Sequence, residues 1–334
     1  MYLWRRVAEV PDITRVKKHF KRTNIAECEL AALSALGSAG YWAASNNVFA
    51  ARLLRTLLRE TCRRLAAPSH APDPTAWKSD HITAAWLGHS TVLINFYGVT
   101  ILTDPVLFRR VGADLRFGTV GPRRLIAPAL SVRELPPIDI VLLSHAHMDH
   151  FDLPTLKCLP ATTRAVTAQS TADLFRTTRI HKITELGWGD KSRVHTRHGD
   201  IDIQAFEVNH WGARWRRDTH RGYNGYVLAR EGTRIVFGGD TAWTTNFRHL
   251  RSRQPIDLAI MPIGAYKPWL CSHCTPEQAV RMANDAGARY FLPIHHQTFP
   301  LGREDRSEPI QRLQGAIEKD RLALKDVGET FVLA

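Results

Sequence analysis

A short run of metal-ligand side chains behind a largely apolar segment constrains this chain more than any other feature. The segment 138–143 leads into His145, His147, Asp149 and His150. Imidazole and carboxylate groups bind borderline and hard metal ions at neutral pH. Because residues i and i+2 of an extended segment share a face, the first two histidines can face one ion, while a turn beyond can aim the other two ligands at a second. The sequence therefore predicts a buried strand that delivers ligands for two metal ions to a sheet edge.

Three further ligand-type residues each follow an apolar, strand-like run. They are His210, Asp240 and His295. Loops that follow strands at the same edge of a sheet lie close together, so these residues can converge with the histidine cluster. Gly238 and Gly239, just before Asp240, fit a close backbone approach around a crowded centre. The alternative, a set of unrelated core and surface histidines, does not explain ligand-type side chains at successive strand ends.

The distribution of apolar residues predicts an α/β fold. Strand-like runs occur at 82–87, 91–96, 100–103, 138–144, 201–208, 225–228, 234–237, 258–262 and 290–294. Helical patterns occur at 171–177, 244–251, 276–286 and 309–319. Hairpin-like strands followed by strands that alternate with helices predict two sheets covered by helices on their outer faces.

Composition divides the chain into three zones. Residues 1–67 are predicted to form a helical, basic extension, residues 68–80 contain three prolines and are predicted to be a linker, and residues 81–334 form the main domain. The amphipathic segment 47–65 places leucines on one stripe and arginines mostly away from it. We favour a helix packed on the main domain with a solvated basic face. The alternatives are peripheral contact with an anionic membrane and a dimer contact.

Charge and cysteine usage narrow the partners and the compartment. The 334 residues include 45 Lys and Arg against 32 Asp and Glu, a formal net charge of +13, which favours phosphate esters, nucleic acid or an acidic membrane surface as partners. The five cysteines are scattered, so we expect no disulfide framework, and we interpret the lone pair Cys271 and Cys274 as loop or packing cysteines. No secretory signal is evident and no apolar run reaches about 18 residues. We predict a cytoplasmic protein, with membrane association as the alternative.

The order of the ligand residues resembles the metallo-β-lactamase fold superfamily. Within it, the chain is more similar to the branch of N-acyl-phosphatidylethanolamine-hydrolysing phospholipase D and ascorbate-6-phosphate lactonase-like proteins. The stretches that carry this likeness are 86–93, 102–105, 121–124, 134–139, 209–211, 239–241, 262–266 and 294–295. The resemblance extends from about residue 82 to residue 299 and does not include the first 80 residues.

This resemblance implies a four-layer αββα sandwich with a dinuclear site. One zinc would be held by His145, His147 and His210, the other by Asp149, His150 and His295, with Asp240 as the bridge. Manganese and iron also suit nitrogen and oxygen ligands. Zinc lowers the pKa of bound water to about 7, which makes hydroxide available for attack at neutral pH. Asp149 is the candidate that orients this nucleophile and shuttles its proton.

Several residues are candidates for substrate contact. His273 stands in a loop where the phospholipase branch also has a histidine near the substrate, and it would contact the phosphate or protonate the leaving group unless it is a loop or capping residue. His89 would orient a ligand through a hydrogen bond or be structural. His296 and Gln297 stand where the branch has Trp-Gly, so the pocket departs from the family shape. The remaining candidates are Arg214, Arg216, Arg217 and Tyr266.

The function expected from these features is hydrolysis of an anionic phosphodiester of phospholipid type. The first alternative is a lactonase, which would use the same metal site to hydrolyse the ester bond of a small, phosphorylated lactone. A nucleic-acid-binding nuclease would explain the basic charge, but the aromatic residues expected along a single-strand groove are sparse. A metal-binding protein without turnover is disfavoured by the intact Asp149.

Overall fold

Two mixed sheets form the core of the domain in the computed structural model, which describes residues 64–115, 118–215 and 217–333. The first sheet has the order β15 (Thr330–Leu333), β1 (Ile82–Gly88), β2 (Thr91–Phe96), β3 (Val99–Thr103), β6 (Ile140–Leu143), β7 (Arg164–Ala168) and β8 (Lys182–Leu186). The second has the order β14 (Ala288–Ile294), β13 (Ile256–Pro262), β12 (Thr233–Phe237), β11 (Gly225–Arg230), β10 (Gly199–Phe206) and β9 (Lys191–Thr196). A separate hairpin joins β4 (Ala113–Leu115) to β5 (Gly118–Val120).

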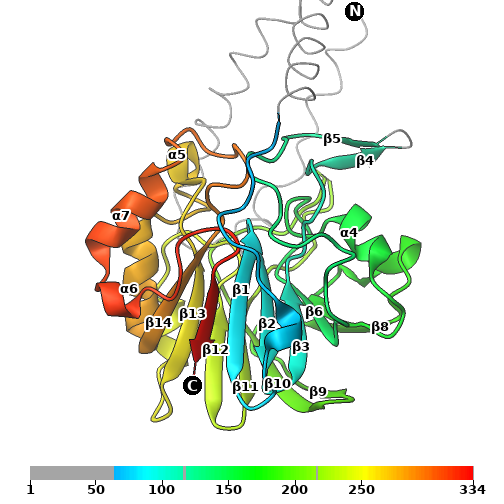
Figure 1. Cartoon of the computed structure of the whole chain (residues 1–334), viewed down its shortest axis with the longest axis horizontal. Helices are drawn as coiled ribbons and strands as arrows, with labels where there is room; N and C mark the ends of the chain where they lie inside the picture. Colours follow the sequence, from blue (N-terminus) through cyan, green and yellow to red (C-terminus); the bar gives the residue numbers. More distant parts are fainter. Residues whose placement is uncertain (1–63, 116–117, 216, 334) are drawn as a thin grey trace, which may run out of the picture. The chain divides into compact units, whose positions relative to one another are not determined.

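Helices cover the outer faces of both sheets (Figure 1). They are α4 (Leu153–Cys158), α5 (Tyr266–Trp269), α6 (Pro276–Ala286) and α7 (Glu308–Ala316). Short 3-10 helices span Pro74–Ala76, Ala172–Thr177, Asn246–Leu250 and Lys319–Arg321. In Figure 1, α6 and α7 lie outside β13 and β14, and α4 lies at the other side of the domain.

Helix α6 shows how local sequence sets an element. Thr275 caps its first turn through a capping box with Gln278, and Gly287 ends it in the left-handed conformation at φ 77°. Its buried face, which includes Met282 and Ala286, packs on the outer face of β13 and β14. The helix predicted at 276–286 is confirmed.

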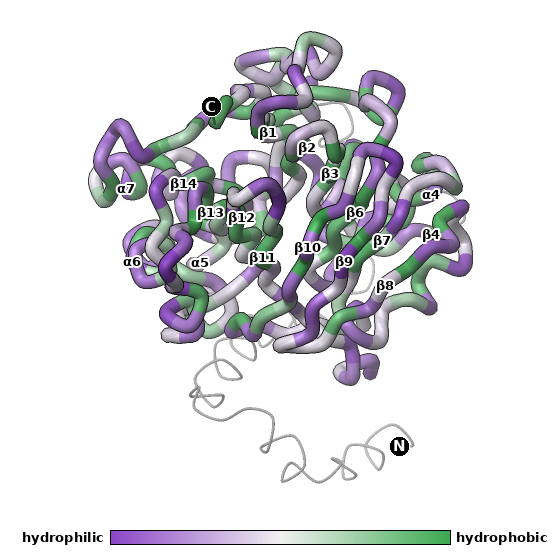
Figure 2. Tube along the Cα trace, turned by 90° about the horizontal axis from the view of Figure 1, so that it is seen from below, coloured by the Kyte–Doolittle hydropathy of each residue, from purple (hydrophilic) through white to green (hydrophobic). Residues whose placement is uncertain are grey.

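The space between the sheets holds the main hydrophobic core. Strands β1, β2 and β6 are buried along their whole length, as expected for central strands with cover on both faces. Trp86, Tyr226 and Phe237 are among its largest side chains. Figure 2 shows hydrophobic colour along strands of both sheets and hydrophilic colour in many turns. Because this core fixes both sheets against each other, it also fixes the loops at their edges.

Strand direction determines where those loops lie. Strands β3, β6, β7 and β8 run parallel to one another, as do β12, β13 and β14. Parallel neighbours end at the same edge, so the segments that follow them gather at one end of the sandwich. The ligand-type residues of the sequence follow β6, β10, β12 and β14.

Every strand run predicted from the sequence corresponds to an observed strand, with boundaries that shift by a few residues. The predicted helical patterns at 171–177 and 244–251 are 3-10 helices. The elements that were not predicted are strands β4, β5, β7, β8, β9 and β15 and helices α4 and α5. Nearly all of the predicted extension 1–67 lies outside the described residues, so its membrane contact stays a prediction. Among described residues, no helix has the length and apolar character needed to cross a bilayer.

Candidate metal centre

Three imidazole rings converge after β6 and β10. Backbone N–H groups of His150 and Phe151 both donate to the carbonyl of His147, at 3.1 and 2.8 Å, which closes a tight turn behind the strand. Nδ1 of His147 lies 2.8 Å from Nε2 of His145 and 3.3 Å from Nε2 of His210. These three residues form a group with ligand atoms close enough to hold one metal ion.

A second group surrounds Asp149. Its Oδ2 lies 3.6 Å from Nε2 of His150, 3.5 Å from Nε2 of His295 and 3.1 Å from Nε2 of His89. All four ligand atoms lie close enough to share one ion. The turn after β6 therefore feeds two neighbouring ligand groups, as the spacing of the sequence predicts.

Asp240 lies between the two groups. Its Oδ2 is 3.1 Å from Nε2 of His150, 3.1 Å from Nε2 of His295 and 3.9 Å from Nε2 of His210. The approach of Asp240 depends on Gly239, where an added Cβ would meet the Ser144 side chain at 2.7 Å and φ is +57°. The close backbone approach predicted for the Gly-Gly pair is confirmed here, and it lets one carboxylate face both groups.

A network behind the ligands fixes which ring nitrogen faces the centre. His150 Nδ1 donates to Asp104 Oδ2 at 2.6 Å, and His210 Nδ1 donates to the Ser272 carbonyl at 2.8 Å. The Ser144 hydroxyl donates to Asp104, so it accepts from His145 Nδ1 at 2.9 Å. Protons held on Nδ1 leave Nε2 of these histidines free to bind metal.

Asp104 is the functional residue that sequence analysis missed. It is fully buried at the end of β3 and also accepts a hydrogen bond from the Ser144 backbone N–H at 2.7 Å. The signal was present, since a carboxylate directly after an apolar strand is unexpected in a core. The sequence could not show that this carboxylate would face His150 rather than a metal ion.

The electrostatics of the centre match a cation site. Burial, together with neighbouring imidazoles, lowers the pKa of His147 to about 3 and holds that of His145 well below its usual range, so both are neutral ligands. Burial alone would lower the pKa of His295, but Asp240 and Asp149 raise it to about 9. Asp149 and Asp240 thus stabilise a positive charge beside them. Bound metal ions would supply that charge, so that His295 could remain neutral and act as a ligand.

Unpaired buried polar atoms support the same conclusion. His147 Nε2, His150 Nε2, Asp240 Oδ1 and both ring nitrogens of His295 have no hydrogen-bond partner although they are buried. Buried polar atoms in native proteins are nearly always paired. These unpaired atoms belong to both ligand groups and to Asp240, which lies between the groups. The site therefore has suitable ligand atoms for two metal ions, one in each group.

Comparison with known proteins identifies the family. A family model described as a beta-lactamase superfamily domain matches residues 100–296. The chain belongs to the beta-lactamase superfamily. An uncharacterized protein of Mycobacterium tuberculosis is 30% identical over 277 residues, which cover 80% of this chain and 73% of that protein. N-acyl-phosphatidylethanolamine-hydrolyzing phospholipase D 1 of Caenorhabditis elegans is 32% identical over 258 residues, covering 73% of this chain and 71% of that protein.

Solved structures agree on the fold of this superfamily member. Igni18, a metallo hydrolase from Ignicoccus hospitalis, superposes with a TM-score of 0.57 at 19% identity, covering 76% of this chain and 99% of that one. The metallo-beta-lactamase fold protein YhfI from Bacillus subtilis superposes with a TM-score of 0.52 at 15% identity, covering 76% and 100%. The predicted αββα sandwich is thereby confirmed.

A pocket of about 220 Å³ opens beside the ligands of this superfamily member. His147, Asp149, Asp240 and His295 border it, together with His273. Its apolar wall includes Trp211, Trp269 and Leu301. A larger pocket of about 790 Å³ lies between α7 and β15 but contains none of the predicted site residues, so the smaller one is the candidate substrate pocket.

The predicted substrate residues occupy different environments. His273 lies in the pocket with Nδ1 3.8 Å from Asp240 Oδ2. His89 is buried against Asp149, which favours the orienting role over direct substrate contact. Tyr266 is buried and donates its hydroxyl to Glu308 at 2.9 Å.

The basic loop after His210 has a structural contact. Nη1 of Arg214 donates to the carbonyls of Ala146 and Phe151, at 3.1 and 2.8 Å, and so clamps the ligand turn. Arg217 is exposed, and Arg216 lies outside the described residues. Substrate binding by these arginines stays a prediction.

Among the described residues, no group of candidate metal ligands includes Cys271 or Cys274. Cys274 is a buried free thiol, whereas Cys271 takes part in a disulfide. The sequence predicts no disulfide framework, and the described residues contain one disulfide-bonded cysteine, Cys271. Because Cys271 is oxidised and only Cys274 is a free thiol, the pair offers no two-thiolate metal site, and the histidine and aspartate groups are the metal candidates.

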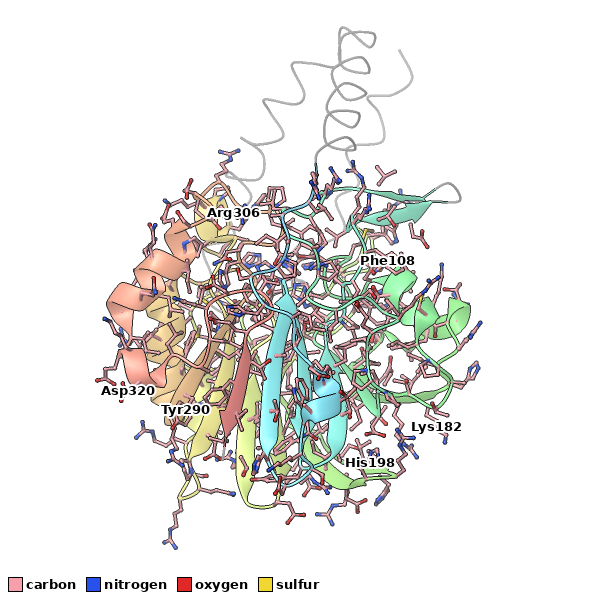
Figure 3. All side chains as sticks on the ribbon, in the orientation of Figure 1. Phe108, Lys182, His198, Tyr290, Arg306 and Asp320 are labelled. Atoms are coloured by element: carbon pink, nitrogen blue, oxygen red, sulfur yellow. The ribbon has the colours of Figure 1, made fainter. Side chains whose placement is uncertain are left out.

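Replacing Asp104 by Ala is expected to weaken metal binding about 10–100-fold, because His150 loses the acceptor that orients its ring. Zinc affinity measured by competition with a chromophoric chelator checks this. Asp139→Ala is the matched control: Asp139 accepts from His198 Nδ1 at 2.9 Å at the other end of β6. In Figure 3, His198 lies at the end of the domain opposite to Arg306, a residue that borders the same small pocket as His295. Equal losses in both variants would show that Asp104 acts only through stability.

Proposed function

We propose that this metal-dependent hydrolase uses two zinc ions to hydrolyse an anionic phosphodiester of phospholipid type, such as an N-acyl-phosphatidylethanolamine. The observation that carries the proposal is the convergence of both ligand groups on Asp240 beside a pocket with tryptophan walls. Relatives from Caenorhabditis elegans and Saccharomyces cerevisiae are named for hydrolysing this lipid, which supports the choice of substrate. The formal net charge of +13 favours an anionic substrate.

The residues of the chain have separate tasks in this reaction. Zinc ions bound to the two groups would make water acidic enough to supply hydroxide near neutral pH and would neutralise charge on the phosphate. Asp149, held by Nε2 of His89 at 3.1 Å, would orient the attacking water and accept its proton. The water oxygen bonds to phosphorus, the bond from phosphorus to the leaving oxygen breaks, and the proton passes to that alcohol.

His273 would contact the phosphate from the pocket side. Its ring lies 5.2 Å from the rings of both His210 and His295, centroid to centroid, and borders the same cavity as Asp149. A positioned imidazole can donate a hydrogen bond to a phosphoryl oxygen or pass a proton to the leaving oxygen. It borders the space proposed for the substrate and belongs to neither of the two ligand groups described above, although it also lies within ligand distance of His210 and Asp240.

Replacing His273 by Ala is expected to lower kcat about 100-fold or more while the zinc content stays at the wild-type value. Steady-state hydrolysis and elemental analysis of the same sample check this. His220→Ala, at an exposed histidine, serves as the control for loss of an imidazole. Loss of zinc in the His273 variant would make this residue a ligand, and an unchanged rate would remove it from the mechanism.

The bond that is cleaved is tested with zinc-reconstituted protein and a panel of substrates. The panel contains bis(p-nitrophenyl) phosphate, an N-acyl-phosphatidylethanolamine, single-stranded RNA and several lactones. We expect turnover of the first two. Turnover of lactones alone would defeat the phosphodiester proposal, and preference for RNA would select the nuclease.

A further inference from the structure

His296 is a buried side chain that the proposed mechanism does not use. Its exposed fraction is only 4%, and neither ring nitrogen has a hydrogen-bond partner in the described part of the chain. Its ring stacks on Trp86, with centroids 4.5 Å apart and planes at 18°. The stacking fixes the ring in place, so the missing partners are not explained by a freely turning side chain. A buried donor or acceptor without a partner costs about 1–3 kcal/mol.

A small pocket lies beside this ring. It has a volume of about 100 Å³ and is bordered by His296 and Gln297. Ala265, His295 and Leu301 border both this pocket and the substrate pocket, so the two cavities adjoin across these residues. A water molecule occupies about 30 Å³ in the liquid, so the space accepts a few waters or one small polar group.

The two carboxylates that border this small pocket have partners of their own. Both carboxylate oxygens of Glu304 accept backbone N–H groups, from Ala265 and Lys267. Asp305 accepts from the backbone and the hydroxyl of Ser307. Arg306 is exposed at the rim, where Figure 3 shows it pointing outward. Neither carboxylate is therefore left to pair with His296, and an uncharged polar group is the best match for a neutral imidazole.

We infer that this small pocket is a subsite in which His296 binds an uncharged group of the substrate that both donates and accepts hydrogen bonds, an amide or a hydroxyl. A neutral imidazole presents one N–H donor and one acceptor nitrogen, which is the complement of such a group. The inference rests on the proposed function, because the N-acyl amide of the leaving alcohol supplies this pair of groups.

The variant His296→Phe tests the subsite. Phenylalanine retains a flat ring that can stack on Trp86 but offers no hydrogen bond. We expect the ratio of kcat/KM for an N-acyl-phosphatidylethanolamine to kcat/KM for bis(p-nitrophenyl) phosphate to fall about tenfold or more, mainly through KM, because a site built to pair with a polar group discriminates against losing it. His296→Gln, which retains a donor and an acceptor, should recover much of the ratio. An unchanged ratio in the Phe variant would overturn the inference.

The matched control is His181→Phe, an exposed histidine next to Lys182, which Figure 3 labels far from Arg306. It should leave the ratio unchanged. A binding measurement separates this inference from the proposed function: N-acetylethanolamine is titrated into the zinc-loaded protein and followed by NMR. If the wild type cleaves no phosphodiester, the proposed function fails, yet binding at least about tenfold weaker in His296→Phe would still support the subsite. Equal binding by both proteins would reject it.

Discussion

Replacing Asp240 by Asn is expected to reduce hydrolysis by at least about 100-fold and to release zinc from the protein. Loss of a group that only orients a ligand already costs about 10–100-fold in metal affinity or activity, and Asp240 faces both ligand groups directly. The amide keeps the shape of the side chain but removes the negative charge that both ions would share. Elemental analysis of zinc per chain, with rates of phosphodiester hydrolysis, measures the effect.

Asp257→Asn is the control for this substitution. Asp257 is also largely buried, but it accepts from the Arg234 backbone N–H at 3.0 Å near the start of β13, away from the ligand loops. This variant should retain its zinc and its rate. An Asp240 variant that retained two zinc ions and wild-type turnover would show that the carboxylate does not bridge metals.

Stripping the metal with a chelator is expected to abolish hydrolysis and to lower the melting temperature by about 5 °C or more. A ligand present at 100 times its Kd stabilises the folded state by about 2.7 kcal/mol, and such a change shifts melting by several degrees in a domain of this size. Burial alone would raise the carboxyl pKa of Asp149 and Asp240, but His150, His295 and other neighbouring histidines hold it well below its usual range. Positive charge at this place therefore stabilises the folded state, and bound cations would supply it. Differential scanning calorimetry before and after addition of zinc measures the shift.

A second cluster provides the control for chelation. His70, Asp326 and Glu329 bring ligand-type atoms together at the surface. The Glu329→Gln variant should show the same loss of activity and the same shift in melting temperature on chelation. If the shift vanished in this variant, the stabilising ion would belong to the surface cluster and not to the centre around Asp240.

Periodicity and ligand spacing predicted much of this molecule. The apolar runs located the central strands, because these are buried on both faces and leave an unbroken hydrophobic signal. The edge strands β8 and β9 were missed because their burial is partial and irregular and because charged residues interrupt them, so they show no clear apolar periodicity. The seven predicted metal ligands do come together around Asp240, since each follows a strand that ends at one edge.

The sequence could not reveal the side chains that act through other residues. Asp104 is close to His150 only because β3 and β6 are parallel neighbours. Arg214 turns onto the carbonyls of the ligand turn, although its position in a basic loop favoured a substrate role. Such contacts depend on register and on side-chain direction, which hydrophobic patterns do not encode.

The most direct test of the account is an anomalous diffraction map of zinc-loaded crystals, recorded at the zinc absorption edge. The account predicts two peaks: one among His145, His147 and His210, the other among Asp149, His150 and His295, with Asp240 in contact with both. A single peak, or zinc bound only elsewhere on the chain, would contradict the dinuclear centre and the hydrolysis built on it.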